Sequence, residues 1–281
     1  MLLVVESGST KSDWVLVENK AITHNFKTMG FNPFFHDEKI IHQALKENTG
    51  LYQIANQVTN LFFYGAGCSS EEMNNIIKNA FSKIFSNATI EVEHDLLACA
   101  LATYEEEPAI SCIIGTGSNS CYFDGDQLIE KVPALGYVLG DEGSGSYYGK
   151  KILTDFLYNK LPNEIKTDLI DNQQISKNVI FENIYMKPNP NVYLASFMPF
   201  IAKYKETDYV KEMVIKGMYH FMENHVCCYD NYKEVKTHFI GSLSEVFKNE
   251  LFIAADQLNV QVGSIIQKPI DNLVNYHIKH S

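Results

Sequence analysis

The sequence lacks any apolar run of about 18 residues, the length from which a membrane-spanning helix is suspected. We therefore expect no membrane span, and the opening residues lack the basic segment and long apolar stretch of a signal peptide. Positive charge is also scarce: 23 Lys and Arg stand against 34 Asp and Glu, a net charge of −11. Because phosphate contacts need a basic face, this balance argues against a nucleic-acid partner. One local pocket with Mg²⁺ could still bind a nucleotide.

The six cysteines form no Cys-x-x-Cys pair and no spacing typical of metal ligands. Several stand among apolar residues, where a free cysteine packs as a small hydrophobe. This usage predicts a reduced, cytoplasmic protein. An apolar fraction of 46% and a charged fraction of 20% are ordinary for a globular protein, so we expect no extensive disorder. A chain of 281 residues is long for one core and suits two.

Glycine is concentrated in one stretch, from Ile113 to Gly149, which holds eight of the 16 glycines. Glycine lets backbone N–H groups approach a ligand closely and adopts positive φ without strain. Here it alternates with hydroxyl, amide and carboxylate side chains, in Gly-Thr-Gly-Ser-Asn and Gly-Asp-Glu-Gly-Ser-Gly. The stretch therefore predicts ligand-binding loops, although two glycine-rich hairpin turns without a ligand would use the same residues.

The first hundred residues predict a strand meander followed by alternating helices and strands. Short apolar or alternating runs predict the strands, at Leu2–Val5, Asp13–Glu18, Ala21–Met29, Leu61–Tyr64 and Thr89–Val92. Helical spacing predicts a helix from Lys39 to Glu47 that Gly50 closes, one after Ser69 as a cap, and one over Asp95–Tyr104. The order β-β-β-α-β-α-β-α combines an antiparallel meander with parallel crossovers.

The same order then starts again. Predicted strands at Ala109–Ile114, Ser120–Phe123 and Leu128–Val132 follow one another through a Gly-Thr-Gly-Ser turn and an Asp-Gly turn. Mainly helices follow, with later strands at Thr237–Ile240, Val260–Gly263 and Ile265–Ile266, a helix at Ser244–Asp256 and a terminal helix at Asp271–Ile278. A unit that repeats once after about 110 residues predicts two similar domains rather than a solenoid.

Two glycine and hydroxyl turns therefore occupy the same place in each half, at 7–10 and 115–118. Such turns offer backbone N–H groups and hydroxyls to phosphate oxygens, and we expect them to face each other across an interdomain cleft. The position three after Gly117 is Ser120, so the second turn is no Rossmann fingerprint. Nor is Gly140–Gly145 a Walker loop, because Ser146 follows it in place of Lys.

Three motifs in this order resemble the N-acetylglucosamine kinases and, more widely, the BadF-type ATPases of the sugar-kinase and actin superfamily. They are Glu-Ser-Gly-Ser-Thr-Lys at 6–11, Ile-Gly-Thr-Gly-Ser-Asn at 114–119 and Gly-Asp-Glu-Gly-Ser-Gly at 140–145. Weaker matches follow at 239–244 and at Lys268-Pro269. The resemblance implies an α/β fold of two ribonuclease H-like (actin-like ATPase) domains around the cleft. Residues 1–108 would form the first domain, with the helix at 268–281 packing back on it, and residues 109–267 the second, with a helical insertion.

The resemblance also implies cofactors and their ligands. Both glycine turns would bind ATP, helped by the expected adenosine loop; the residues are Ser7, Gly8, Ser9, Thr10, Lys11, Gly115, Thr116, Gly117, Ser118, Gly241 and Ser242. Glu6 stands where the family usually has the aspartate that orients Mg²⁺. A glutamate keeps the charge but moves the carboxylate by about 1 Å.

For the sugar, the resemblance implies Asp95 as the catalytic base that accepts a hydroxyl proton, the one such acceptor that phosphoryl transfer needs. Asp95 could instead cap the helix that follows it, since aspartate is a favoured N-cap. The substrate-binding set would be Asn32, Gly67, Asp95, Thr116, Asn119, Gly136 and Asp141. Asn32 precedes a proline, also a common turn signal, and Glu142 could equally be a solvated loop charge.

We therefore expect an ATP-dependent kinase that phosphorylates the 6-hydroxyl of an amino sugar, most of all N-acetylglucosamine, with N-acetylmuramate and glucosamine as the other candidates. The resemblance also suggests a homodimer. Two alternatives stay open. One is an ATPase that activates a dehydratase and carries an iron–sulfur cluster, for which Cys112 and Cys121 lie near the right region. The other is a sugar or nucleotide sensor that has lost catalysis, which Glu6 would suit.

Overall fold

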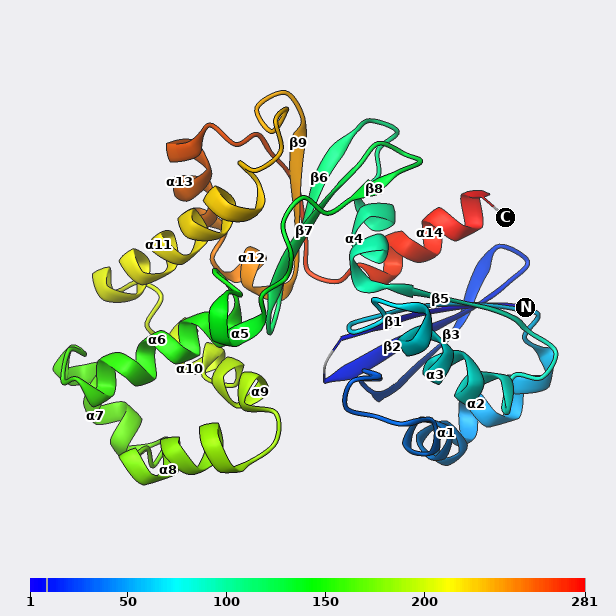
Figure 1. Cartoon of the computed structure of the whole chain (residues 1–281), viewed down its shortest axis with the longest axis horizontal. Coiled ribbons are helices and arrows are strands. Elements are labelled where there is room, and N and C mark those ends of the chain that lie inside the picture. The colour runs from blue at the N-terminus through cyan, green and yellow to red at the C-terminus, as the bar shows by residue number, and fades with distance from the viewer. Residues whose placement is uncertain (9, 281) are drawn as a thin grey trace. The chain divides into compact units, whose positions relative to one another are not determined.

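The computed structural model describes residues 1–8 and 10–280 (Figure 1). The chain divides into two compact units. Unit 1 comprises Met1–Glu105 with Lys268–Ser281, and unit 2 comprises Glu106–Gln267. Each unit is built on its own five-stranded sheet.

The sheet of unit 1 has the strand order β3-β2-β1-β4-β5. Its strands are β1 (Leu2–Ser7), β2 (Lys11–Glu18), β3 (Ala21–Met29), β4 (Asn60–Gly65) and β5 (Thr89–His94). The first three pair antiparallel, and β4 and β5 join them parallel to β1. The central β1 is apolar along most of its length because both faces of the sheet are covered, whereas the edge strand β3 is mostly exposed and polar.

Helices cover both faces of this sheet (Figure 1). One face packs against α1 (Glu38–Glu47), α2 (Thr49–Ile54) with the short 3₁₀ turn Ala55–Gln57, and α3 (Glu71–Ser82). The other face packs against α4 (Asp95–Thr103) and α14 (Ile270–His280). The first face holds the core: Trp14 is fully buried, lies 5.5 Å from the Phe81 ring and donates through Nε1 to Thr28 Oγ1 at 2.9 Å.

Unit 2 repeats the plan with the strand order β10-β9-β6-β7-β8. Its strands are β6 (Ala109–Ile114), β7 (Ser118–Phe123), β8 (Leu128–Ile129), β9 (Lys236–Ile240) and β10 (Val262–Ile266). The meander β6-β7-β8 is antiparallel, and β9 and β10 run parallel to β6. The strand order of unit 1 therefore occurs twice, as the repeated sequence pattern predicted.

A large helical region separates β8 from β9 in unit 2. It contains α5 (Gly136–Leu139), α6 (Gly145–Leu157), α7 (Asn163–Asp171), α8 (Lys177–Phe181) with a π-helical turn at Glu182–Met186, α9 (Pro190–Ala195), α10 (Met198–Lys203) and α11 (Asp208–His225). Helices α12 (Ser242–Val246) and α13 (Lys248–Leu258) follow β9. Apolar residues from α6, α11 and α13 share one buried core with β6.

Four local predictions were wrong. Gly50 does not end a helix but lies inside α2, because Asn48 caps a new helix by accepting from Leu51 N–H at 3.1 Å. The cap of α3 is Ser70, which accepts from Met73 N–H, rather than Ser69. Strand β8 stops at Ile129, since it is an edge strand that runs towards Pro133. The helix predicted over Ser244–Asp256 is broken into α12 and α13 at Phe247.

Within residues 1–8 and 10–280, no helix combines the length and hydropathy that crossing a bilayer requires.

The contact of α14 with the sheet predicts a pH-dependent stability. His277 is 6% exposed, and its Nε2 lies 2.9 Å from the hydroxyl of Tyr64. Burial lowers the pKa of His277 to about 4. Because this value lies below that of an unfolded histidine, the folded state loses stability as the pH falls from about 6.5 towards 4, by at most about 3 kcal/mol.

His277→Gln cannot titrate, so its unfolding free energy should fall less than that of the wild type between pH 7 and pH 4.5, measured by urea unfolding. His24→Gln, at an exposed position of β3, is the matched control and should follow the wild type. An identical pH dependence for His277→Gln and the wild type would contradict the assignment.

Candidate functional site

In unit 1 the loops that carry predicted site residues leave the same edge of the sheet. Ser7, at the end of β1, pairs with Gly65 at the end of β4, and Gly65 pairs with His94 at the end of β5. Ala66 N–H donates to Ser7 O at 3.0 Å. The turn after Ser7, the loop that holds Gly67, and Asp95 therefore start side by side, at the carboxyl ends of parallel strands where α/β sheets bind ligands.

The first glycine turn connects β1 and β2. Gly8 N–H donates to Lys11 O at 3.0 Å, and Thr10 and Lys11 are exposed, whereas Ser9 lies outside the described residues. The hydroxyl of Ser7 is already used: it is fully buried, accepts from Phe31 N–H at 2.8 Å and from Ser12 Oγ at 2.8 Å. Ser7 can offer a ligand little beyond its backbone, and among the described residues of the turn Thr10 carries an exposed hydroxyl.

Three carboxylates gather beside this turn. Glu6 pairs with Asp13 across the antiparallel strands, which places both side chains on one face of the sheet. Burial and, to a smaller extent, the charges of Asp13 and Asp95 raise the pKa of Glu6 to about 7, against the opposing effect of Lys11 and Lys268. Asp13 was not predicted from the sequence. The predicted hairpin could have identified Asp13, because pairing the two strands across the turn places Asp13 opposite Glu6.

Asp95 is the first residue of α4, and the N-cap position belongs to His94, whose side chain makes no capping hydrogen bond. The alternative prediction, that Asp95 is simply the helix cap, is therefore wrong. A carboxylate in the first turn is still favoured by the helix dipole, so α4 stabilises a charged Asp95 at this position.

The two predicted sugar-binding residues of unit 1 lie against each other. Gly67 has a φ of +85°, and a Cβ at this position would lie 2.5 Å from Asn32 Oδ1. Asn32 is 8% exposed, and its Oδ1 accepts from Phe34 N–H at 3.0 Å, which leaves Nδ2 as the donor of the amide. The Asn-Pro turn and close packing on a glycine thus fix the orientation of this amide.

In unit 2 the Gly115 turn and the Gly140–Gly145 loop are joined by backbone hydrogen bonds. Gly145 N–H donates to Gly115 O at 2.8 Å, and Ser146 N–H donates to Thr116 O at 3.0 Å. Asp141, at a φ of +58°, accepts from Ser118 N–H at 3.3 Å, and a Cβ on Gly117 would lie 3.0 Å from its carboxylate oxygens. Burial raises the pKa of Asp141, opposed by the hydrogen bond from Ser118. The structure therefore brings together residues that are about 25 positions apart in sequence.

The predicted adenosine loop meets the same turn. Strands β6 and β9 are parallel, so Gly241, just after β9, lies beside the end of β6. Gly241 has a φ of +131°, and a Cβ here would lie 2.0 Å from Ile114 O. Ser242 is exposed at the start of α12. Two further predicted residues lie outside this junction. Asn119 donates through Nδ2 to Glu130 Oε2 at 3.4 Å. Gly136 is the first residue of α5, and a Cβ at this position would have no atom within 4 Å.

Comparison with known proteins was made with sequence families, curated proteins and solved structures. No family model matches the sequence, and no curated protein does either. A protein of Porphyromonas gingivalis, provisionally named an N-acetylglucosamine kinase, is 33% identical over 100% of both chains, with a TM-score of 0.95. The chain belongs to this family of sugar kinases.

Two further structures share the fold at 14% identity. One, from Chromobacterium violaceum and also provisionally named an N-acetylglucosamine kinase, has a TM-score of 0.71 over 98% of each chain. The other, a ROK-family glucokinase from Streptomyces griseus in complex with glucose and AMPPNP, has a TM-score of 0.57 over 98% of this chain and 97% of its own. The predicted α/β fold of two ribonuclease H-like domains is confirmed; the narrower BadF-type assignment stays a prediction.

The sugar kinase holds its Gly140–Gly145 loop with residues that were not predicted. Glu142 O accepts from Ser118 Oγ at 2.7 Å, and the Glu142 side chain faces α11, with Asn224 Nδ2 at 3.4 Å and His225 Nε2 at 4.0 Å. Glu142, left open as a solvated charge, is therefore tied to the helix. Nothing in the local sequence marks Asn224 or His225, because their helix is more than 80 residues away.

The carboxylates of unit 1 fit a magnesium ion that is held partly by phosphates. Among the described residues, no three His, Cys, Asp or Glu side chains converge tightly enough to hold a metal alone. Mg²⁺ in phosphoryl-transfer sites needs only one or two carboxylates in addition to substrate oxygens. Burial, which is the largest cause of the raised pKa of Glu6, and the charges of Asp13 and Asp95 disfavour its ionised form, which a bound cation would favour. The kinase contains no arginine, so lysine and histidine are the basic side chains available to contact phosphate.

The raised pKa of Glu6 predicts how stability depends on pH without nucleotide or metal. The pKa of Glu6 is about 7 in the folded protein, above the value of 4.5 for a free carboxyl. Its contribution to the free energy of unfolding is therefore fully present below pH 4.5 and is lost as the pH rises through 7. Glu6→Gln should therefore be more stable than the wild type at pH 8, by up to about 3 kcal/mol, and nearly equal at pH 4. Urea unfolding at both values checks this; a constant difference would contradict it.

The junction of Gly241 with β6 predicts a graded glycine series. Gly241→Ala should lower the unfolding free energy by more than about 2 kcal/mol, because backbone strain of about 1–3 kcal/mol adds to overlap with the Ile114 carbonyl. Gly136→Ala is the control: it has positive φ but open space, so only about 1–2 kcal/mol of strain applies. Equal losses in thermal unfolding would show that the contact with β6 does not matter.

Proposed function

We propose that this kinase transfers the γ-phosphoryl group of ATP to the 6-hydroxyl of an amino sugar, above all N-acetylglucosamine. The observation that carries the proposal is the full-length 33% identity with the Porphyromonas gingivalis protein. It is supported by the convergence of the predicted loops in each unit and by the nucleotide analogue and glucose bound to the Streptomyces griseus glucokinase of the same fold.

Unit 1 would supply the metal, phosphate and base functions. The turn Gly8–Lys11 would bind the β- and γ-phosphates through backbone N–H groups, Thr10 and Lys11. Glu6 would hold Mg²⁺, which neutralises phosphate charge when bound. Asp95 would accept the proton of the sugar 6-hydroxyl, and Asn32 with Gly67 would bind the sugar. Each of these groups leaves the same sheet edge or contacts a residue that does.

Unit 2 would supply the second set of contacts. Gly115–Ser118, Gly241 and Ser242 would bind the nucleotide, and Asn119, Gly136, Asp141 and Thr116 the sugar. Asp141 already accepts hydrogen bonds from Ser118 N–H, at the start of β7, and from Ser146 Oγ, so its contact with sugar would use the remaining oxygen lone pairs.

The proposed reaction is a single displacement. As Asp95 takes the proton, the sugar O6 forms a bond to the γ-phosphorus and the bond to the β–γ bridging oxygen breaks, which releases ADP. Such a transfer depends mainly on positioning and charge stabilisation, since the protein makes no covalent bond to the phosphoryl group.

The alternative activator function finds no support in the cysteines. Cys112 and Cys121 are fully buried in the β6–β7 pair, and burial raises the pKa of Cys112 well above its usual value. Both side chains pack in the unit 2 sheet as small apolar groups.

The test is a coupled ADP-release assay with N-acetylglucosamine, N-acetylmuramate, glucosamine and glucose. N-acetylglucosamine should give the highest kcat/KM, and Asp95→Asn should lower kcat about 10²–10⁴-fold with little change in melting temperature. The matched control is Glu91→Gln. Glu91 is an exposed carboxylate of β5, the strand that directly precedes α4, and this variant should keep wild-type activity.

ADP release without sugar stimulation, or an unimpaired Asp95→Asn, would overturn the proposal. ATP binding without any turnover, restored by Glu6→Asp, would instead support the sensor alternative.

A further inference from the structure

Helix α11 supports the loop Gly140–Gly145 on one of its faces. Gly143, at a φ of +71°, lies so close to the helix that a Cβ on it would be 3.1 Å from Phe221 Cβ and 3.3 Å from Gly217 O. Phe221 follows Gly217 by four positions, so both residues lie on one face of the helix. A side chain at position 143 would push the loop away from α11, so this contact requires glycine.

The same face of α11 continues to the side chain of Glu142. Asn224 Nδ2 donates to Glu142 Oε1 at 3.4 Å, and His225 Nε2 lies 4.0 Å from Glu142 Oε2. Asn224 and His225 follow Phe221 by three and four positions, the spacing of neighbours on a helix surface. Two consecutive loop residues, Glu142 and Gly143, therefore contact consecutive turns of one helix.

The position of His225 is fixed by contacts that use neither ring nitrogen. The residue is 6% exposed, and its ring stacks on the ring of Phe221 at a centroid distance of 5.1 Å and an interplanar angle of 14°. Its backbone oxygen accepts from Ser120 Oγ at 2.5 Å, which joins the end of α11 to β7. The two nitrogens of the imidazole are left for other partners.

These two nitrogens have different surroundings. Nε2 faces Glu142, whereas Nδ1 is buried and has no hydrogen-bond partner among residues 1–8 and 10–280. Burial lowers the pKa of His225, against the opposing charge of Glu142, so the ring carries one proton near pH 7. A buried N–H without an acceptor is costly, which assigns this proton to Nε2. The neutral imidazole thus directs its single donor towards the Glu142 carboxylate.

The residue before Glu142 needs such support. Asp141, the predicted sugar ligand, has a φ of +58°, a left-handed conformation that residues other than glycine keep only where the surrounding structure enforces it. Its carboxylate accepts from Ser118 N–H at 3.3 Å. The next residue is held twice, by Ser118 Oγ at its backbone oxygen and by α11 at its side chain. The contacts from α11 therefore help to fix the direction of the Asp141 carboxylate.

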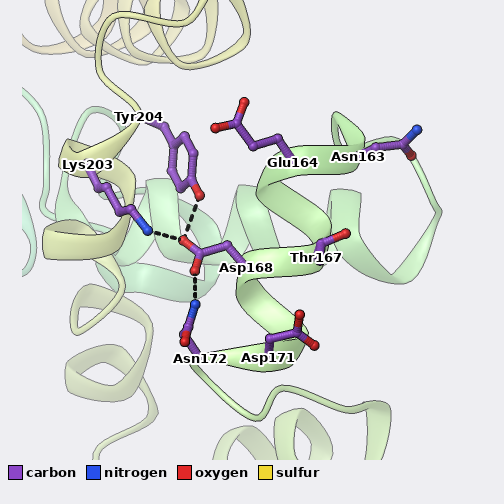
Figure 2. A pocket seen from close by; sticks show the side chains of 8 residues that line it. All are labelled: Asn163, Glu164, Thr167, Asp168, Asp171, Asn172, Lys203 and Tyr204. Carbon is purple, nitrogen blue, oxygen red and sulfur yellow. Dashed lines mark hydrogen bonds and ion pairs between the residues drawn. The ribbon is translucent and has the colours of Figure 1, made fainter.

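A carboxylate of unit 2 that supports the helical region is bound differently (Figure 2). Asp168 of α7 accepts from Lys203 Nζ at 2.7 Å, from Tyr204 Oη at 2.6 Å and from Asn172 Nδ2. Glu142 instead faces two neutral donors at longer distances. Hydrogen bonds that serve an active site commonly shorten when the substrate binds. The side chain of Glu142 has room to move towards α11 in this way.

We propose that His225, with Asn224 beside it, is a positioning residue of the sugar site: it holds Glu142 against α11 and so directs Asp141 towards the sugar. The inference rests on the proposed function and deepens it by naming the residues behind the Gly140–Gly145 loop. Neither side chain is among the predicted nucleotide contacts. Their loss should therefore weaken binding of the sugar and change the use of ATP little.

The test is steady-state kinetics of the full chain with ATP and N-acetylglucosamine, or whichever sugar of the ADP-release panel gives the highest kcat/KM. His225→Phe keeps a ring against Phe221 but loses the N–H. It should raise the sugar KM on the order of 10-fold, with kcat and the KM for ATP within about twofold of the wild type. His225→Gln keeps an N–H donor and should recover most of the loss. His220→Phe, at an exposed position of the same helix, is the matched control and should behave as the wild type.

A double-mutant cycle shows whether His225 acts through Glu142. Glu142→Ala should raise the sugar KM at least as much as His225→Phe, and the double variant should be no worse than Glu142→Ala alone. Asn224 is exposed, so Asn224→Ala remains a test if His225→Phe fails to fold. It should raise the same KM about 2- to 5-fold.

An unchanged sugar KM in the folded variants of His225 and Asn224 overturns the inference. Additive effects of His225→Phe and Glu142→Ala also overturn it, as does a His225→Gln variant no better than His225→Phe, which would indicate a structural effect. In these cases sugar-stimulated ADP release by the wild type leaves the proposed function standing. If the wild type shows no such release, the proposed function is wrong, and calorimetry of N-acetylglucosamine binding decides the inference alone. Weaker binding by His225→Phe then supports it, and equal affinities or no binding by the wild type overturn it.

Discussion

In-register parallel pairing at the carboxyl ends of the strands is the constraint on which both candidate site regions depend. In unit 1 it aligns Ser7, Gly65 and His94, and in unit 2 it places Gly241 beside the end of β6. A slip of one residue would send every side chain of a strand to the opposite face. The predicted residues meet because the backbone ladder holds the starting points of their loops together, without direct contact among most of their side chains.

Successive side chains along β1 and β2 point to opposite faces of the sheet. This separates the residues that hold the hairpin together from the residues that could contact a ligand. Ser7 and Ser12 point to the face that holds the aromatic core, where their hydroxyls join both strands to Phe31. Glu6 and Asp13 point to the other face, towards α4 and the segment before α14. The first hydroxyl of the motif thus joins the hairpin to Phe31, whereas Glu6 and Asp13 lie on the opposite face, where Lys11 forms an ion pair with Asp13 at 3.6 Å.

Much of this could be predicted from the sequence, because strand periodicity, the repeated turn and the glycine motifs are local signals. The doubled α/β fold followed from them, whereas the position of Gly241 beside the end of β6 depends on parallel pairing that local signals do not show. What local signals could not provide are partners from distant segments: His225 beside Glu142 and Lys268 near Glu6. Ser70 in place of Ser69 as a cap shows the other limit, since two adjacent serines satisfy the same rule.

The absence of arginine makes these distant partners consequential. Arginine would neutralise buried carboxylates and phosphates through fixed bidentate contacts, but every cation here is a lysine or a histidine. The carboxylates of unit 1 therefore retain charge that Lys11 and Lys268 only partly offset. In unit 2, glycine turns present backbone N–H groups where an arginine could otherwise bind phosphate. A chain with a net charge of −11 and no arginine therefore has few positively charged side chains with which to offset the charge of a phosphate ligand.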